Sequence, residues 1–221
     1  MNFLQLIVDI LKFLFQGNNS LPQTKAAFKS LAGSIVPNTP ALTEQDTYSI
    51  EALNLHTDEY QIWILNHYVS LKLILGNSNI YLANATAGML NVAARQLITA
   101  GRNKQLISPT VLHEEGPFAA LEATDRCRTI TLLEQLQADL ASLPFPFRNN
   151  PGIVLALISI ITMLATNGYY SEWSGYGSTR LEPPDRRKIE HFPASWKQIG
   201  YPGPSNGYHA LRGYLFNQFT E

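Results

Sequence analysis

The sequence predicts an all-α fold: one helical domain over residues 1–221, with a helical body (1–167) and a long irregular C-terminal segment (168–221). Two observations predict the body. Apolar residues recur at spacings of three and four, the period of an amphipathic helix, and no long alternating pattern typical of a strand precedes Gly168. A third observation predicts the segment, which holds seven of the 14 glycines and five of the 13 prolines together with eight Tyr and Trp residues. Because large aromatics are rare in disordered tails, we expect an ordered segment that wraps its own domain or forms an interface.

Helix start and stop signals divide the first part of the body. Pro22 suits the first turn of a helix, which Pro37 ends. Residues 43–46 resemble an N-cap with acidic residues in the first turn. Residues 57–59 (Thr-Asp-Glu) open another helix, which we expect to stop at Gly76.

Three further helices follow from the same signals. Residues 79–100 carry apolar residues at helical spacing and end before Gly101. Thr124 and Asp125 cap a helix that we expect to run to Leu140. Residues 151–168 begin with proline and end at glycine, and their apolar run, 153–164, predicts the central helix of the fold, apolar on all sides because it is surrounded.

Charge and cysteine content exclude several function classes. The formal net charge is −1, so the basic footprint of a nucleic-acid-binding protein is absent and we expect no nucleic-acid partner. Charged residues make up only 15%, and 45% are hydrophobic, which is enough for a sizeable core. The one cysteine, Cys127, excludes a disulfide or a Cys-based metal site within the chain. Its place inside a predicted helix indicates an ordinary packed thiol.

Two apolar runs bear on localisation. Residues 3–15 and 153–164 are both shorter than the ~20 residues of a spanning helix, so we expect no transmembrane span in this chain. The first run has polar residues at Gln5, Asp9 and Lys12 and lacks the basic start of a secretory signal. It fits a core or partner-facing helix, a membrane-surface helix or an atypical signal. We expect a cytoplasmic or membrane-associated protein.

Patterns typical of catalytic, cofactor and metal sites are missing. The histidines form neither an HxxxH nor an HExxH arrangement, and adjacent residues such as His113 and Glu114 diverge on a helix. Residues 174–178 (SGYGS) lack the strand, turn and helix of a nucleophile elbow and the third glycine of a dinucleotide loop. We therefore expect no catalytic residue, bound cofactor or metal in this chain.

The C-terminal segment instead carries the residue types of binding hot spots. Tyr, Trp and Arg are enriched at the hot spots of known interfaces. Residues 180–188 form a charge cluster that fits either a solvated turn or the polar rim of an interface. The predicted partner-binding residues are Tyr170, Trp173, Tyr176, Arg180, Trp196 and Tyr201. Core packing is the alternative role for several of them.

Two phrases of the chain resemble the gluconate 2-dehydrogenase subunit 3 family. Residues 31–37 (LAGSIVP) look like the family's early helix, which ends in an Ala-x-x-Ile-x-Pro phrase. Residues 168–173 (GYYSEW) and 196–204 (WKQIGYPGP) look like its closing signature, a Gly-Tyr/Phe-Tyr phrase followed by Trp-Lys-x-x-Gly-Tyr/Phe-Pro-Gly. The two matches bracket most of the chain.

The resemblance implies a non-catalytic accessory subunit. Members of that family are small subunits of membrane-bound sugar and alcohol dehydrogenases. Their partner is a large flavoprotein dehydrogenase subunit of the glucose–methanol–choline type, which carries FAD, often with a cytochrome. Many members carry a twin-arginine export signal, which this sequence does not show.

Two other functions fit the residues. One is an independent enzyme or small-molecule-binding protein with a pocket under the C-terminal segment, using His191, Glu190 or Tyr176 as polar groups. The other is a structural homo-oligomer that buries the aromatic surface against a second copy.

Overall fold

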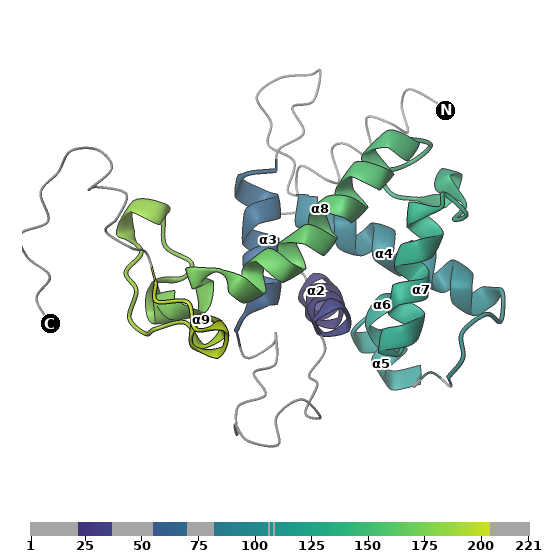
Figure 1. Cartoon of the computed structure of the whole chain (residues 1–221). Coiled ribbons are helices and arrows are strands. Elements are labelled where there is room, and N and C mark those ends of the chain that lie inside the picture. Colours follow the sequence, from purple (N-terminus) through teal and green to yellow (C-terminus); the bar gives the residue numbers. More distant parts are fainter. Residues whose placement is uncertain (1–21, 37–54, 70–81, 106, 108, 204–221) are drawn as a thin grey trace, which may run out of the picture.

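The computed structural model describes residues 22–36, 55–69, 82–105, 107 and 109–203, and every regular element in these ranges is a helix (Figure 1). The all-α prediction is confirmed for this part of the chain. The α-helices are α2 (Pro22–Ile35), α3 (Thr57–His67), α4 (Leu82–Thr99), α5 (Pro109–Glu114), α6 (Pro117–Ala120), α7 (Ala123–Glu134), α8 (Pro151–Tyr170) and α9 (Ala194–Ile199). The 3₁₀ turns are η2 (Leu140–Ser142), η3 (Glu172–Thr179) and η4 (Pro184–Arg186).

Helix α2 is the central helix of the bundle. It packs against α3, α4, α6, α7 and α8, and Figure 1 views it nearly end-on between them. Phe28 and Leu31 of α2 are fully buried, while α8 lies across the bundle with one side open. The prediction that residues 151–168 form the central, surrounded helix is therefore wrong. The shorter α2 takes the central place because its small residues and Phe28 pack against five neighbouring helices, while Lys25 and Lys29 stay on its exposed side.

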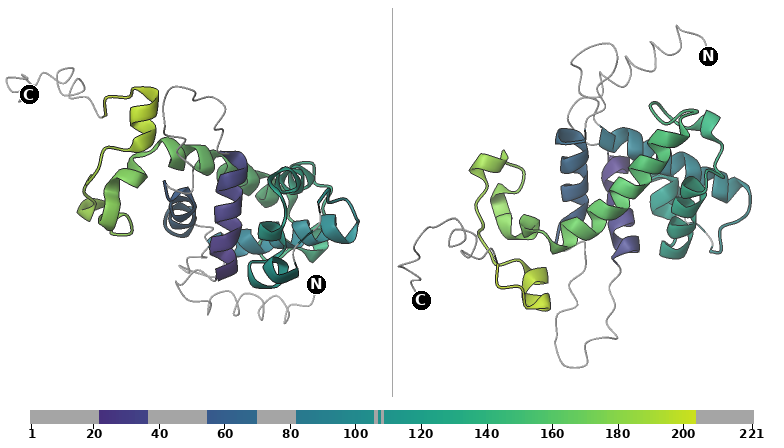
Figure 2. Two further views of the ribbon diagram at one scale, coloured as in Figure 1. Left: turned by 90° about the horizontal axis from the view of Figure 1, so that it is seen from below. Right: turned by 45° about the horizontal axis from the view of Figure 1, so that its top comes forward.

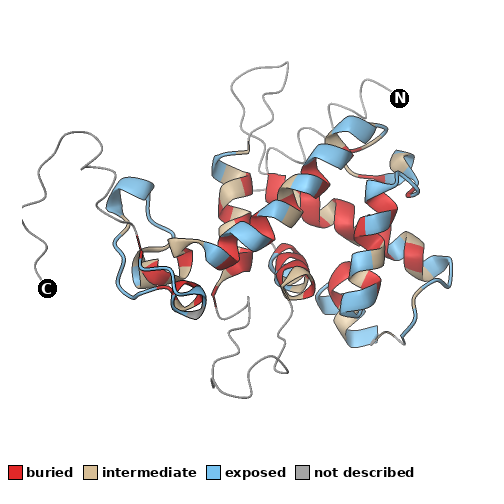
Figure 3. Ribbon diagram, in the orientation of Figure 1, coloured by how far each residue is buried: buried red, intermediate tan, exposed pale blue. Residues whose placement is uncertain are grey.

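The open side of α8 is visible as a pale stripe along the helix in Figure 3. Val154, Ile158 and Ile161 point into the core, whereas Met163 is 51% exposed and Leu155 is also exposed. The sequence pattern does not distinguish the two sides because residues on both are apolar. An apolar helix is fully surrounded only when its neighbours are long and numerous enough to cover it.

Helix α8 is also longer than the apolar run within it. It has 20 residues, of which an 18-residue stretch has a mean hydropathy of 1.7, so by length and composition it could cross a membrane; 44% of that stretch is buried inside the fold. Length therefore does not exclude a span, contrary to the sequence-based argument. The buried share packs on α2, α3 and α7.

Glycine 168 lies inside α8 and does not end it. A Cβ at this position would lie 2.6 Å from Cδ1 of Tyr60 and 3.0 Å from Cγ2 of Thr57, both on α3. The glycine thus allows close packing of two helices, and α8 continues to Tyr170. At the other end the prediction holds: Asn150 caps the helix by accepting from the main-chain N–H of Ile153, and Pro151 takes the first turn.

Other predicted boundaries are met in part. Gly101 ends α4 with a positive φ of 62°, as expected. The helix expected to reach Leu140 ends at Glu134, because Leu136 takes a left-handed φ of 53° and Gln137 then donates back to the carbonyl of Leu132. Asp58 lies inside the first turn of α3 and His56 is the N-cap. Helix α3 ends at His67, with Tyr68 as its C-cap, so the prediction of one helix running on to Gly76 is wrong. Helix α2 ends at Ile35, just before the predicted stop at Pro37. The boundaries predicted at 43–46 and 79 lie outside the described residues, as does the apolar run 3–15.

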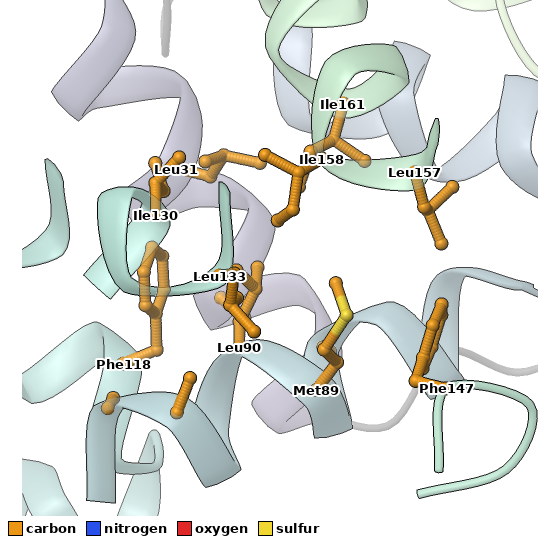
Figure 4. Packing of buried hydrophobic residues seen from close by; sticks show 14 of the residues in the cluster. Leu31, Met89, Leu90, Phe118, Ile130, Leu133, Phe147, Leu157, Ile158 and Ile161 are labelled. Carbon is orange, nitrogen blue, oxygen red and sulfur yellow. The ribbon is translucent and has the colours of Figure 1, made fainter. Parts of the chain in front are cut away.

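The core joins residues from all the long helices (Figure 4). Leu90 of α4, Phe118 of α6 and Leu133 of α7 are fully buried, and Phe147 closes the cluster near Met89. A buried side chain of this size stabilises the fold by about 1.5–3 kcal/mol relative to an exposed one. This core fixes α3 and α8, and these two helices position the C-terminal segment.

Candidate functional site

The C-terminal segment 171–203 lies at one end of the bundle, away from α5, α6 and α7 in all three views (Figures 1 and 2). It contacts the body through η3, which packs on α3 and α8, and through α9, which packs on α8. Instead of one long irregular wrap, the described part consists of short helical turns joined by loops. Two aromatic clusters hold it in place.

Trp196 is the centre of the first cluster. Its side chain is buried, and its indole Nε1 donates to the main-chain oxygen of Tyr170 at 2.7 Å. The rings of Phe192 and Tyr201 pack edge-on against the Trp196 ring, with centroids 5.7 Å and 4.9 Å away. The indole thus joins α9 and both flanking loops to the last residue of α8.

Large apolar side chains remain exposed around Trp196. Tyr170 is 51% exposed, Phe192 53%, Ile199 56% and Tyr201 42%. We call these four residues the C-terminal apolar patch. Three of them contact Trp196 or share its hydrogen bond, and Ile199 lies on the same short helix. Grouped exposed apolar side chains on a rigid base are typical of interaction surfaces.

The second cluster lies between α3 and η3. The guanidinium carbon of Arg187 lies 4.0 Å from the ring centroid of Trp63, 4.9 Å from that of Trp173 and 5.7 Å from that of Tyr176. Trp173 is buried and packs edge-on against Tyr60 at 5.5 Å. We call Trp63, Trp173 and Tyr176 the aromatic cage.

Hydrogen bonds and ion pairs fix this region electrostatically. The hydroxyl of Tyr176 donates to Oε1 of Glu172 at 3.0 Å, and burial together with that carboxylate raises the pKa of Tyr176 to about 12. Nε of Arg180 lies 3.3 Å from Oε2 of Glu59 on α3, and its Nη1 donates to the carbonyl of Gly177. The charge cluster 180–188 is therefore split: Arg180 and Arg187 point inward, and the rest of it is exposed.

The structure separates the six predicted partner-binding residues into three groups. Tyr170 and Tyr201 are exposed and belong to the C-terminal apolar patch. Tyr176 and Arg180 are half-buried and bond within the chain. Trp173 and Trp196 are buried and hold the segment together. Contact of any of them with a partner stays a prediction.

The sequence-based prediction did not include four residues of these clusters. Phe192 and Ile199 complete the patch, and Trp63 and Arg187 complete the cage. The signal for Phe192 was available, since an apolar side chain within a polar loop, beside the predicted aromatics, is unusual. Trp63 offered no signal, because it is indistinguishable from the other apolar residues of its helix before the tertiary contacts are known.

The polar residues that the sequence suggested for an independent binding pocket make other contacts or are exposed. Glu190 accepts from the main-chain N–H and the hydroxyl of Ser178, and these hydrogen bonds lower its pKa. His191 is exposed beside it.

A pocket of about 140 Å³ lies elsewhere, between the ends of α4 and α7, and is lined by Leu97, Arg102, Arg128, Thr131, Leu132, Gln135 and Gln137. Among the described residues no group of three or more His, Cys, Asp or Glu is arranged to hold a metal ion.

Cys127 differs from its prediction. The thiol is exposed on α7, and its Sγ lies 4.0 Å from the carbonyl oxygen of Ser34. The prediction of a packed thiol is therefore wrong. Position 127 lies on a different side of α7 from Ile130 and Leu133, which point into the core.

Comparison with known proteins adds no relative. No protein-family model matches the chain, and neither a curated protein nor a solved structure matches it. The resemblance to the gluconate 2-dehydrogenase subunit 3 family thus rests on the phrases in the sequence alone.

Proposed function

We propose that this chain is a non-catalytic accessory subunit that binds and stabilises a larger protein through its C-terminal apolar patch. The observation that carries the proposal is the patch itself: Tyr170, Phe192, Ile199 and Tyr201 are exposed together around the buried Trp196. Rigid aromatic side chains give large contact area at small entropic cost, which is why Tyr, Trp and Phe are enriched in the centres of interfaces.

The construction of the patch supports binding better than chemistry. Trp196 packs edge-on against the rings of Phe192 and Tyr201 and bonds to the main-chain oxygen of Tyr170, so less order has to be gained on association. Glu190 and Tyr176, two titratable groups of the same segment, are held by hydrogen bonds within the chain. They are not arranged as a nucleophile with its base.

The proposed partner is an FAD-dependent dehydrogenase subunit of the glucose–methanol–choline type. This part of the proposal rests on the family resemblance, whose closing phrase, residues 196–204, includes Trp196 and Tyr201. FAD would be held by the partner, which would perform hydride transfer, while this chain contributes stability and position. A cytochrome could join the same complex, and membrane association would then come from the complex.

The test is affinity capture of the tagged full chain from its native cells, followed by flavin absorbance and mass spectrometry. We expect a stoichiometric flavoprotein with the wild-type chain. The double variant Phe192→Ser with Tyr201→Ser should lose it, since central aromatic contacts each contribute about 2 kcal/mol or more. Leu181→Ser is the matched control, because Leu181 is an apolar residue of the same segment that is 65% exposed and does not belong to the patch.

Two results would contradict the proposal. If the double variant captured the flavoprotein at wild-type yield, the patch would not be part of the interface. A partner-free chain whose mass in light scattering doubles with concentration would favour the homo-oligomer, since the same patch could be buried against a second copy.

A further inference from the structure

The aromatic cage holds the guanidinium of Arg187. Arg128 pairs with Asp125 and Arg180 with Glu59, but no ion pair joins the guanidinium of Arg187 to a carboxylate of the described residues. Its Nε donates to the main-chain oxygen of Glu182 at 2.9 Å, within the same loop. A half-buried cation in such a place is stabilised by the ring faces, whose quadrupoles attract positive charge.

The cage satisfies the charge of Arg187 but not its hydrogen-bond donors. Nη2 of Arg187 is buried and finds no acceptor among the described residues. The indole Nε1 of Trp173, which is itself only 2% exposed, is likewise buried without an acceptor. Leaving a buried donor unpaired costs about 1–3 kcal/mol. A cation without N–H donors would therefore fit the three rings better than a guanidinium does.

The rings are held by contacts that do not involve Arg187. The imidazole of His67 stacks on Trp63 with centroids 4.4 Å apart and an angle of 16° between the ring planes. Tyr60 supports Trp173 from the side, and Glu172 holds the hydroxyl of Tyr176. The cage is thus built to persist when Arg187 leaves it.

Arg187 reaches the cage from an exposed loop. Within residues 181–191 it is the one residue that is not exposed. Hydrogen bonds fix the end of the loop. The hydroxyl of Thr179 donates to the main-chain oxygen of Lys188 and accepts from its main-chain N–H, and Glu190 accepts from the main-chain N–H of Ser178. The side chain of Arg187 contacts the rings of the cage, while its Nε bonds within the loop to the main-chain oxygen of Glu182.

We propose that Trp63, Trp173 and Tyr176 form a binding site for a small quaternary ammonium compound, and that Arg187 occupies this site as an internal plug. Three ring faces around a positive charge are the common way in which proteins bind such compounds. A quaternary nitrogen has no donors, so it fills the cage without the unpaired Nη2 that the guanidinium leaves there. This site is separate from the C-terminal apolar patch and does not rest on the proposed partner.

The experiment uses the full chain with Arg187→Ala and titrates tetramethylammonium chloride, read by tryptophan fluorescence and by melting temperature. Sodium chloride at equal ionic strength corrects for salt, and tert-butanol is the neutral probe of similar size. We expect saturable binding by Arg187→Ala that is at least about tenfold tighter than binding by the wild type. Arg186→Ala, which removes an exposed arginine beside the plug, should behave as the wild type.

The proposal is overturned if folded Arg187→Ala shows no saturable response, if tert-butanol acts equally well, or if Arg187→Ala with Trp63→Ala still binds. Should Arg187→Ala alone fail to fold, tetramethylammonium must restore its folding where sodium chloride does not, because a ligand of the folded state raises stability. Failure of that rescue would equally overturn it.

Discussion

The indole of Trp196 and the main-chain oxygen of Tyr170 are joined by a hydrogen bond of 2.7 Å, across 26 residues of sequence. This bond attaches α9 to the last residue of α8. Both residues carry the sequence resemblance, one as a buried anchor and the other as an exposed ring.

Truncating this anchor should destabilise the isolated chain. We expect Trp196→Ala to lower the free energy of unfolding by about 3–5 kcal/mol, the usual cost of emptying a buried aromatic site. Ile199→Ala, on the same helix but exposed, should change it by less than about 0.5 kcal/mol. Urea unfolding of both variants checks the difference. An unchanged stability of Trp196→Ala would mean that the indole is not part of the core.

Two glycines in helices should respond oppositely to alanine. Gly168→Ala places a Cβ 2.6 Å from Tyr60 and should destabilise the α3–α8 contact. Gly33 of α2 has no atom within 4 Å of such a Cβ, so Gly33→Ala should stabilise the chain by about 0.5–1 kcal/mol through helix propensity. Thermal unfolding measures both. A stabilising Gly168→Ala would contradict the close approach of the two helices.

The carboxyl group of Asp58 should make stability fall as pH rises. Burial raises its pKa above the ordinary 3.8, and the charge of Glu59 adds to this. Because the folded state holds this proton more tightly than the unfolded state, the contribution is fully present below pH 3.8 and is lost as pH rises through the folded-state pKa.

The variant Asp58→Asn tests whether the contribution of Asp58 to stability falls as pH rises. We expect the variant to gain stability relative to the wild type at pH 7 and to lose that advantage at pH 3, as measured by urea unfolding at both values. Asp185→Asn, in an exposed turn, is the control and should shift little at either pH. A larger advantage of Asp58→Asn at pH 3 than at pH 7 would reverse the assignment.

Tyr176 should ionise late in an alkaline titration. Burial and the neighbouring carboxylate of Glu172 raise its pKa from 10.0 to about 12, so the phenolate absorbance of one tyrosine should appear only near that pH. The stability from this phenol is present below pH 10 and is lost as pH rises through about 12. Difference titration of the wild type against Tyr176→Phe isolates this residue.

Glu172→Gln separates the two causes of the Tyr176 shift. Removing the charge should lower the pKa of Tyr176 while leaving the contribution of burial in place. An unchanged titration of Tyr176 in Glu172→Gln would place the whole shift on burial, against the short contact between the two side chains.

The sequence predicted local features well where one short stretch contains the cause. Pro151 at the first turn of α8 and Gly101 after α4 act through their own backbone, and both boundaries are as expected. The all-α class follows from helical spacing for the same reason. The end of α7 was missed because Leu136, a residue without preference for positive φ, takes the left-handed conformation there.

The candidate site was predicted by residue type and not by arrangement. The abundance of Tyr, Trp and Arg after residue 168 pointed to the right segment. It did not reveal which rings are covered: Trp173 and Trp196 are buried, whereas Tyr170 and Tyr201 are exposed. It also left out Trp63, which lies 110 residues before Trp173 in the sequence and 5.9 Å from it between ring centroids.

By itself, therefore, the sequence determined the helical class, the starts of α3 and α8 and, for residues 171–203, an ordered aromatic segment, since propensity, capping and glycine or proline geometry act within a few residues. The tertiary structure alone decided that α2 is central, that α8 keeps an open apolar side, and that Gly168 serves packing. It also decided that Arg187 lies among three rings. These features depend on which surfaces meet, and contacts between residues far apart in the chain set that outcome.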